Sequence, residues 1–294
     1  MILVTGATGQ LGSAVVHRLL ERTAGADIAA LARDESKAGA LAARGVSVRV
    51  GDYDDTAALD RAMVGVDRVL LIAGNTPQRR VRQHQNVIDA ARRAGVGLIG
   101  FASRSLRDVQ GSENTLMHDY FETEDRIRRS GLPHVLFRNA LYLDTVPHYV
   151  GGLRVFETGI RLPAGDGKVA YALRREMGEA LANAMLDHEG ADRTYVVAAS
   201  RGYTFDDVAA ALTEVSGRTI DYTRISDEEY VADAARAGLP EHLARRFLGF
   251  FSDIRSHQLD ETSSDLETLL GRTPTRLPEG LREVFGLSRS DTRS

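Results

Sequence analysis

The first sixteen residues, MILVTGATGQLGSAVV (residues 1–16), place three glycines at spacings of three behind a short apolar run. The run Ile2–Thr5 is typical of a buried strand, and the segment after the glycines has the spacing of an amphipathic helix. At such a junction Gly6 can make a tight turn, Gly9 lets the backbone approach a diphosphate, and Gly12 lets helix and strand pack closely. The stretch therefore predicts a dinucleotide site between the first strand and the first helix.

The rest of the first half repeats this alternation of short apolar runs and helical segments. Further strands are predicted at Asp27–Ala32, Val46–Val50, Arg68–Ala73, Gly97–Ala102 and His134–Arg138, and helices at Gln10–Arg22 and Arg80–Ala94. The alternation predicts an α/β fold, a Rossmann-type doubly wound parallel sheet with helices on both faces. We expect this nucleotide-binding domain to span residues 1–143.

After residue 143 the alternation loosens. The predicted elements there are a helix at Arg174–Leu186, a strand at Arg193–Ala199, a helix at Phe205–Ser216 and a strand at Thr219–Tyr222. They indicate a smaller mixed α/β lobe over residues 144–294, some segments of which return to the main sheet. The substrate is expected between the two regions.

Composition excludes several kinds of chemistry. The 294 residues carry a net charge of −4 without long blocks of one sign, so we expect no nucleic acid partner. The absence of cysteine excludes disulfides and thiolate chemistry, and the eight histidines form no pair with metal-ligand spacing, so no metal site is predicted. Since no basic leader and no bilayer-length apolar run is found, a cytoplasmic protein without a membrane partner is expected.

The end of the second predicted strand favours one coenzyme. LARDESK (residues 31–37) places Arg33 there and Lys37 one helical turn on, and a guanidinium suits the 2′-phosphate of NADPH. Asp34 would repel that phosphate if it pointed inward, so NADH stays possible. In GDYDD (residues 51–55), Asp52 and Tyr53 are candidate adenine contacts; alternatively, they form a turn before a helix capped by Asp55 or Thr56.

Several motifs occur together that define a family. They are VTGATGQLG (4–12), Arg33, GDYDD (51–55), QHQNVIDAA (83–91), ETE (122–124), RNALY (138–142) and AGDGK (164–168) with an arginine six residues later. With these motifs the chain resembles the NmrA-like, atypical short-chain dehydrogenases, and within them it is most similar to the type-two NADPH:quinone oxidoreductases. The likeness runs over nearly the whole length.

The resemblance implies a set of site residues. The diphosphate would lie on Gly6, Ala7, Thr8, Gly9, Gln10, Leu11 and Gly12, and the nicotinamide half beside Ala73, Gly74, Asn75, Ser103, Asn139, Tyr142 and Arg174. Two segments depart from the family. AGN (73–75) replaces a run of serines and RNALY (138–142) replaces RNGWY, so the resemblance specifies the coenzyme better than the acceptor.

The usual catalytic pair of short-chain dehydrogenases is incomplete. Tyr120 is followed four residues later by Glu124 instead of lysine. Because Asp119 and Glu122 are also near in sequence, we expect the pKa of the Tyr120 phenol to be raised, which makes it a poor general base. Reduction of a quinone needs less help from an acid than reduction of a ketone. Tyr120, Asn139 and Tyr142 are therefore candidates for orienting the acceptor oxygen, although Tyr120 is alternatively a packing aromatic.

The sequence as a whole predicts an NADPH-dependent reductase of quinones or similar conjugated carbonyls, with a small-molecule substrate. A regulator that senses the dinucleotide without turnover is one alternative, and a biosynthetic reductase or epimerase is another. QRRVRQ (78–83) is interpreted as a solvated helix face near the pocket mouth. RRFLGFF (245–251) is interpreted as core or as a dimer face, and the protein as a monomer or homodimer.

Overall fold

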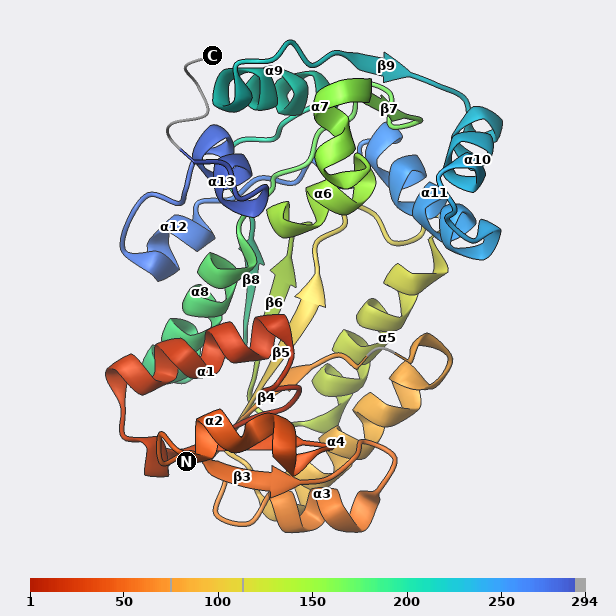
Figure 1. The fold of residues 1–294 in the computed structure, drawn as a ribbon. Helices are drawn as coiled ribbons and strands as arrows, with labels where there is room; N and C mark the ends of the chain where they lie inside the picture. Colours follow the sequence, from red (N-terminus) through yellow and green to blue (C-terminus); the bar gives the residue numbers. More distant parts are fainter. Residues whose placement is uncertain (75, 113, 289–294) are drawn as a thin grey trace.

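The computed structural model describes residues 1–74, 76–112 and 114–288. Within these ranges seven parallel strands form one sheet in the order β3-β2-β1-β4-β5-β6-β8 (Figure 1). Their bounds are β1 Ile2–Val4, β2 Ile28–Ala32, β3 Ser47–Val50, β4 Arg68–Ile72, β5 Leu98–Arg104, β6 His134–Asn139 and β8 Arg193–Val197. The predicted doubly wound parallel sheet is confirmed.

Helices cover both faces of this sheet (Figure 1). Those nearest to it are α1 Gln10–Arg22, α2 Gly39–Ala42, α3 Thr56–Ala62, α4 Arg80–Ala94, α5 Thr115–Ser130, α8 Arg174–Asp187 and α12 Asp265–Leu270. Helices α1 and α8 pack so closely that a Cβ atom on Gly178 would lie 2.5 Å from the Cβ of Ala14. Gly95 and Gly131 end α4 and α5 in the left-handed conformation, as their positions before strands predict.

Burial on both faces explains the uninterrupted apolar strands. All three residues of β1 are buried, and Leu3 lies between Ala29 of β2 and Val69 of β4 in parallel register. The chain crosses over in opposite directions from β1, first to β2 and later to β4. Ligands of such sheets bind in a crevice at the topological switch point, so the site is expected where β1 and β4 end.

The sheet continues beyond residue 143. Strand β8 pairs with β6 in parallel, with Leu136 opposite Thr194, so the predicted strand at Arg193–Ala199 returns to the main sheet. The proposed division of the chain into residues 1–143 and 144–294 stays a prediction.

The other elements of the second half form a separate layer above the carboxyl ends of the strands (Figure 1). They are α6 Val146–Tyr149, α7 Val155–Thr158, β7 Ile160–Leu162, α9 Phe205–Ser216, β9 Tyr222–Arg224, α10 Asp227–Arg236, α11 Glu241–Arg255 and α13 Leu277–Val284. Strand β9 lies later than the predicted Thr219–Tyr222, because Ile220 is buried in the core and the ladder with Ile160 begins only at Tyr222.

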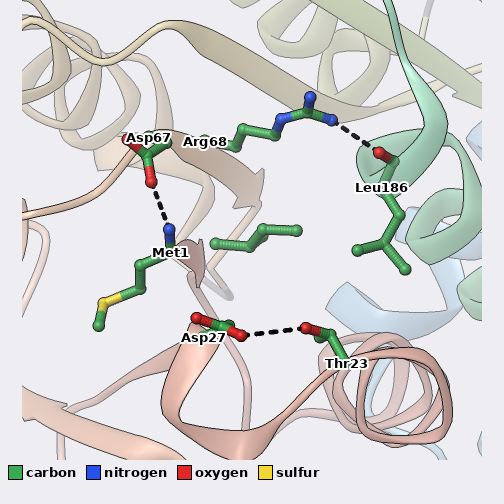
Figure 2. A pocket seen from close by; sticks show the side chains of 7 residues that line it. Met1, Thr23, Asp27, Asp67, Arg68 and Leu186 are labelled. Atoms are coloured by element: carbon green, nitrogen blue, oxygen red, sulfur yellow. Dashed lines mark hydrogen bonds and ion pairs between the residues drawn. The ribbon is translucent and has the colours of Figure 1, made fainter.

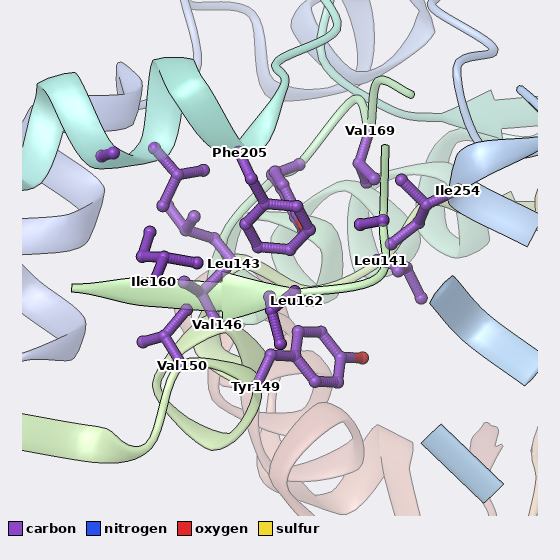
Figure 3. Packing of buried hydrophobic residues seen from close by; sticks show 14 of the residues in the cluster. Leu141, Leu143, Val146, Tyr149, Val150, Ile160, Leu162, Val169, Phe205 and Ile254 are labelled. Carbon is purple, nitrogen blue, oxygen red and sulfur yellow. The ribbon is translucent and has the colours of Figure 1, made fainter. Parts of the chain in front are cut away.

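This layer has its own apolar core. Figure 3 shows Phe205 packed among residues from the segment after β6 and from β7, including Leu143 and Leu162. Phe251 of RRFLGFF is fully buried and its ring lies 5.8 Å from that of Tyr149, measured between centroids. The interpretation as core is confirmed for Phe251, while Phe247, Leu248 and Phe250 are half-buried against the same core. The interpretation of the motif as a dimer face stays a prediction.

Candidate active site

The glycine-rich turn after β1 has the backbone shape expected of a diphosphate site. Gly6 has a φ of +60°, a left-handed conformation that favours glycine. A Cβ atom on Gly12 would lie 2.2 Å from the carbonyl oxygen of Gly6, and a Cβ on Gly9 would lie 3.2 Å from the same oxygen. A side chain at Gly12 would collide with the backbone of the turn and one at Gly9 would crowd it, so these glycines let the start of α1 pack closely against the turn.

The start of α1 leaves donors for an anion. No side chain caps the helix at Gly9, so its first amide groups have no side-chain partner and can bind phosphate oxygens. Ala7 and Leu11 are buried beneath the turn, while Thr8 and Gln10 are exposed. The turn therefore fits a diphosphate group.

Two side chains connect the segments that follow β1 and β3 to the end of β4. The hydroxyl of Thr5 accepts a hydrogen bond from the backbone N–H of Ile72 at 2.9 Å. The hydroxyl of Tyr53 donates to the Ile72 carbonyl at 2.7 Å, and a Cβ on Gly74 would lie 3.7 Å from the Tyr53 ring. Tyr53 thus helps to build the crevice wall, and its contact with adenine stays a prediction. Ala73 is partly exposed here, and Asn75 lies outside the described residues.

The turn after β3 also has a local role. The carboxylate of Asp52 accepts the backbone N–H of Asp54 at 2.9 Å, and that of Asp55 caps α3 by accepting the N–H of Ala58 at 2.9 Å. The turn-and-cap alternative is therefore confirmed, with Asp55 as the cap.

Arg33 is available to a ligand at the end of β2. It is exposed, and among the described residues no hydrogen bond or ion pair engages its side chain; Lys37, in the 3₁₀ helix Glu35–Ala38, is also exposed. Asp34 accepts hydrogen bonds from the hydroxyl and backbone N–H of Ser36, at 2.6 and 3.0 Å. These bonds lower the pKa of Asp34 and hold its carboxylate against its own turn. This arrangement favours a 2′-phosphate beside Arg33.

Arg174, the first residue of α8, connects the glycine turn to the segment after β6. Its guanidinium donates to the side-chain oxygen of Gln10, and its backbone N–H donates to the carboxylate of Asp144 at 2.8 Å. The same guanidinium carbon lies 4.5 Å from the ring centroid of Tyr142. Arg174 thus lies between the predicted diphosphate and nicotinamide positions.

Asn139 ends β6 with an unused acceptor. The residue is 1% exposed, and its side-chain amide donates to the carbonyl oxygen of Ser103 at 3.3 Å. Its Oδ1 is buried and has no hydrogen-bond partner, an arrangement that buried polar atoms rarely keep. An amide N–H donor from a ligand, such as a carboxamide, would satisfy this atom.

Tyr120 lies in a different environment from the one its sequence neighbours predict. The guanidinium carbon of Arg80 lies 4.8 Å from its ring centroid and that of Arg104 lies 5.7 Å from it. Burial by itself would raise the pKa of Tyr120, but the positive charges of Arg104 and Arg80, together with a hydrogen bond from Arg104, outweigh burial, and the pKa is lowered. The expected rise from acidic neighbours is wrong, because Asp119 contributes less than either arginine.

Arg80 also corrects the interpretation of QRRVRQ as a solvated helix face. Arg80 is 5% exposed and forms an ion pair with Asp119 at 3.0 Å. The flanking Arg79 and Arg82 are exposed and pair with Asp54 at 2.7 and 2.8 Å, so the solvated interpretation holds for them. Arg80 lies on the buried face of the helix, where its guanidinium contacts the ring of Tyr120.

Glu124, at the position where relatives of this dehydrogenase class carry lysine, has a structural role. It is fully buried and pairs with Arg138 at 2.8 Å and with Arg128 at 3.0 Å. It also accepts a hydrogen bond from Ser103 at 2.6 Å. The Ser103 hydroxyl is therefore committed to Glu124, and its predicted contact with the coenzyme stays a prediction.

Arg104 is the residue that sequence reasoning missed. It is the last residue of β5, and its guanidinium carbon lies 4.7 Å from the ring centroid of Tyr142 as well as close to Tyr120. A polar side chain at the carboxyl end of a buried parallel strand is a signal that could have found it. Arg104, Tyr120, Tyr142, Arg80 and Arg174 are together called the tyrosine–arginine cluster below.

A cavity of about 200 Å³ lies away from this cluster, where β1 and β4 begin. Figure 2 shows the ion pair between the amino group of Met1 and Asp67 at its rim, with Thr23 and Arg68 nearby. Since ligands of such sheets bind at the opposite ends of the strands, we assign no function to this cavity.

The described ranges lack two further kinds of feature, a metal-ligand group and a membrane-spanning helix. No group of three or more side chains suited to holding a metal ion is present among the residues that the structure describes. Across the same residues, no helix combines the length and apolar character that a bilayer crossing needs.

Two known proteins resemble this chain over nearly its whole length. The chain is 36% identical to quinone oxidoreductase 2 of Escherichia coli (strain K12), over 98% of this chain and 100% of that protein. The crystal structure of the NADPH-dependent quinone oxidoreductase from Escherichia coli, complexed with NADPH, has a TM-score of 0.89 at 34% identity and covers 97% of this chain and 100% of the other. The triphenylmethane reductase of Citrobacter sp., complexed with NADP(H), has a TM-score of 0.90 at 36% identity, with the same coverage.

A family model agrees with both likenesses. The model of the NmrA-like family matches residues 1–284, which is nearly the whole chain. The resemblance inferred from the motifs is therefore confirmed, and the chain belongs to the NmrA-like family.

Proposed function

We propose that this protein is an NADPH-dependent oxidoreductase that transfers hydride to a quinone or a similar conjugated carbonyl acceptor. Relatives that match over nearly the whole chain are named for this chemistry, and two of them were solved with the same coenzyme. The observation in this chain that carries the proposal is the tyrosine–arginine cluster, which Arg174 connects directly to Gln10 of the glycine turn.

The coenzyme is held by residues from three strand ends. The glycine turn receives the diphosphate, Arg33 receives the 2′-phosphate, and the buried Oδ1 of Asn139 accepts a carboxamide N–H. Bound NADPH supplies the hydride. The protein's contribution is to place an acceptor against the rings of Tyr120 and Tyr142, because proximity and orientation account for much of the rate of such a transfer.

Tyr120 is the residue suited to the acceptor oxygen. Its phenol is a hydrogen-bond donor, and the charges of Arg104 and Arg80 make its proton easier to release. A reduced quinone gains negative charge on its oxygens, so a donor beside two guanidinium groups stabilises that product. Arg104 and Arg80 thus perform the electrostatic task of the missing lysine.

Coenzyme binding and turnover are tested separately. Calorimetric titration of the wild type with NADPH should give saturable binding, and oxidation of NADPH by naphthoquinone should follow steady-state kinetics. Arg33→Gln should weaken NADPH binding about tenfold or more while leaving NADH binding unchanged, since one charge-assisted contact to phosphate is lost. Arg44→Gln, which changes another exposed arginine, is the matched control.

The outcomes separate the alternatives. NADPH binding without turnover of any quinone would favour the nucleotide-sensing regulator, and trace rates across a panel of quinones would favour a specialised biosynthetic reductase or epimerase. The cytoplasmic location and the choice between monomer and homodimer stay predictions.

A further inference from the structure

Arg104 is a cation without a counterion at the centre of the cluster. Its Nη1 is buried and has no hydrogen-bond partner. Its guanidinium carbon lies 4.7 Å from the ring centroid of Tyr142 and 5.7 Å from that of Tyr120. The aromatic faces and the Tyr120 hydroxyl, which forms a hydrogen bond with the guanidinium, are neutral groups, so they provide no counterion and leave Nη1 unpaired.

The neighbouring arginines differ from Arg104 in this respect. Arg80 pairs with Asp119 at 3.0 Å, Arg138 with Glu124 at 2.8 Å, and Arg174 with Asp144 at 3.8 Å. Among the described residues, no carboxylate forms an ion pair with Arg104. A guanidinium cannot lose its proton in a protein, and a buried charge without a partner is costly. The missing negative charge is therefore expected from a ligand.

The coenzyme phosphates are not suited to supply it. The glycine turn follows β1 and Arg33 follows β2, whereas Arg104 ends β5, which is two strands from β1 on the side away from β2. Neighbouring strands are about 4.8 Å apart, so Arg104 lies roughly 10 Å or more across the sheet from the phosphate positions. The ligand that meets Arg104 is on the acceptor side.

The surroundings of Arg104 indicate the shape of that ligand. Tyr120 and Tyr142 are both partly exposed, and Arg104 as a whole is partly exposed, so one edge of the group reaches solvent. The ring of Phe101 stacks behind that of Tyr120, with the centroids 6.2 Å apart and the planes at 27°. The rings of the two tyrosines share their faces with guanidinium groups, which are planar and stack on aromatic rings themselves, so the cluster as a whole is suited to a flat aromatic ligand.

We propose that Arg104 is the anion-binding group of the acceptor site, and that the preferred acceptors are flat aromatic compounds carrying an acidic oxygen, such as a carboxylate or an ionised ring hydroxyl. This inference rests on the proposed function, since it concerns the acceptor of the same reaction. The acidic oxygen pairs with the guanidinium, and the ring lies against the tyrosines. Specificity for charge thereby comes from a residue that does not react.

A matched pair of ligands that cannot be reduced tests this directly. Naphthoate and naphthamide have nearly the same shape and differ in charge. Titrated by calorimetry into the protein saturated with NADPH, the wild type should bind naphthoate about tenfold or more tightly than naphthamide, because one charge-assisted pair is present in one complex only. Naphthoate should also compete with the quinone in steady-state assays.

Variants at Arg104 test whether this residue causes the preference for naphthoate over naphthamide. Arg104→Gln should make the affinities for naphthoate and naphthamide equal. Arg104→Lys should retain part of the preference for naphthoate because the charge is kept. Arg107→Gln is the control, since this arginine lies three residues on, has a side chain that is 63% exposed and pairs with Asp260 at 3.1 Å. The control should leave the ratio unchanged.

The results that overturn the inference differ from those that overturn the proposed function. Equal affinity of the wild type for both ligands, or a ratio that survives in Arg104→Gln, overturns the anion site even if quinones are reduced. Absence of quinone turnover together with a naphthoate preference that depends on Arg104 overturns the proposed function and supports the anion site. The wild-type ratio needs no variant, so misfolding of Arg104→Gln cannot obscure the result.

Discussion

Two groups of buried charged residues lie side by side around β5, β6 and α5, and they differ in how their charges are balanced. In the first, Glu124 is matched by Arg138, Arg128 and the hydroxyl of Ser103, so its hydrogen-bonding capacity is used within the protein. In the second, the adjacent strand residue Arg104 meets aromatic faces and keeps an unpaired Nη1. The Glu124 group is complete without a ligand, and the tyrosine–arginine cluster is not.

The difference teaches how to distinguish structural charges from functional ones. A balanced buried group holds elements together, and in this protein it joins α5 to β5 and β6. An unbalanced one keeps a desolvated charge ready for a ligand, at some cost in stability. We therefore expect changes in the Glu124 group to act on folding, and changes in the tyrosine–arginine cluster to act on turnover.

Glu124→Gln should give the largest effect and act on stability. Removing one partner of a buried ion pair leaves the others unsatisfied, and because Arg138 and Arg128 are 26% and 40% exposed, part of that cost is relieved by water. The free energy of unfolding, measured in urea, should fall by about 3 kcal/mol. The Michaelis constant for the quinone should be unchanged.

Glu122→Gln is the matched control on the same helix. Glu122 is 52% exposed and pairs with Arg126 at 2.7 Å, so its loss should cost less than about 0.5 kcal/mol. If the two variants were equally stable, the view of the Glu124 group as a structural support would be wrong.

Acid should weaken the same region through His84. This side chain is fully buried, its Nδ1 lies 2.8 Å from the hydroxyl of Thr123, and burial, with Arg80 nearby, lowers its pKa to about 3. The unfolded chain binds the proton with a pKa of about 6.5, so stability is lost as the pH falls below that value. At about pH 4.5 the loss from this group is about 2 to 3 kcal/mol.

The contribution of His84 is isolated by comparing pH dependences. Urea unfolding of His84→Gln between neutral and mildly acidic pH should show a shallower loss of stability than the wild type. His148→Gln, an exposed position in α6, should match the wild type. Parallel curves for the wild type and His84→Gln would contradict the assignment.

Tyr120→Phe should give the smallest effect in free energy, and it should appear in turnover. The ring contacts with Phe101 and Arg80 are kept, and only the proton donor is lost. We expect kcat for the quinone to fall about tenfold, which is less than the usual contribution of an acid catalyst because the product is weakly basic, with NADPH affinity unchanged. Stopped-flow measurement of the rate of hydride transfer in the wild type and in Tyr120→Phe checks this.

The pH profile gives a second readout for Tyr120. Since Arg104 and Arg80 lower the pKa of this phenol below its ordinary value of 10.0, turnover in the wild type should decline at a pH below that value as the donor ionises. The decline should be absent from Tyr120→Phe and present in Tyr195→Phe, a change on β8. A profile unaffected by Tyr120→Phe would show that this phenol moves no proton.

The fold could be predicted from local patterns because the relevant signals are close in sequence. Apolar runs, the spacing in α1 and α4, and the glycines that end helices identified nearly every element of the sheet. The glycine turn could be predicted for the same reason, since its three glycines and the flanking strand lie within twelve residues. Strand β9 was displaced because its register depends on distant Ile160.

The tyrosine–arginine cluster could not be predicted in the same way. The carboxylates near Tyr120 in sequence suggested the wrong direction for its pKa, because Arg80 and Arg104 reach it from α4 and β5. The inward position of Arg80 was hidden among exposed arginines of one motif. Such neighbours are set by which strands and helices pack together, and a single sequence records that only indirectly.

The turn that holds Asp34 has a consequence for how coenzyme choice evolves. The carboxylate beside Arg33 accepts one hydrogen bond from the hydroxyl of Ser36 and one from its backbone N–H. Alanine at position 36 would remove the hydroxyl bond and keep the backbone one, so the carboxylate would turn more easily toward a ribose diol at the same strand end. The balance between the two nicotinamide coenzymes would then shift through a hydroxyl that contacts neither of them.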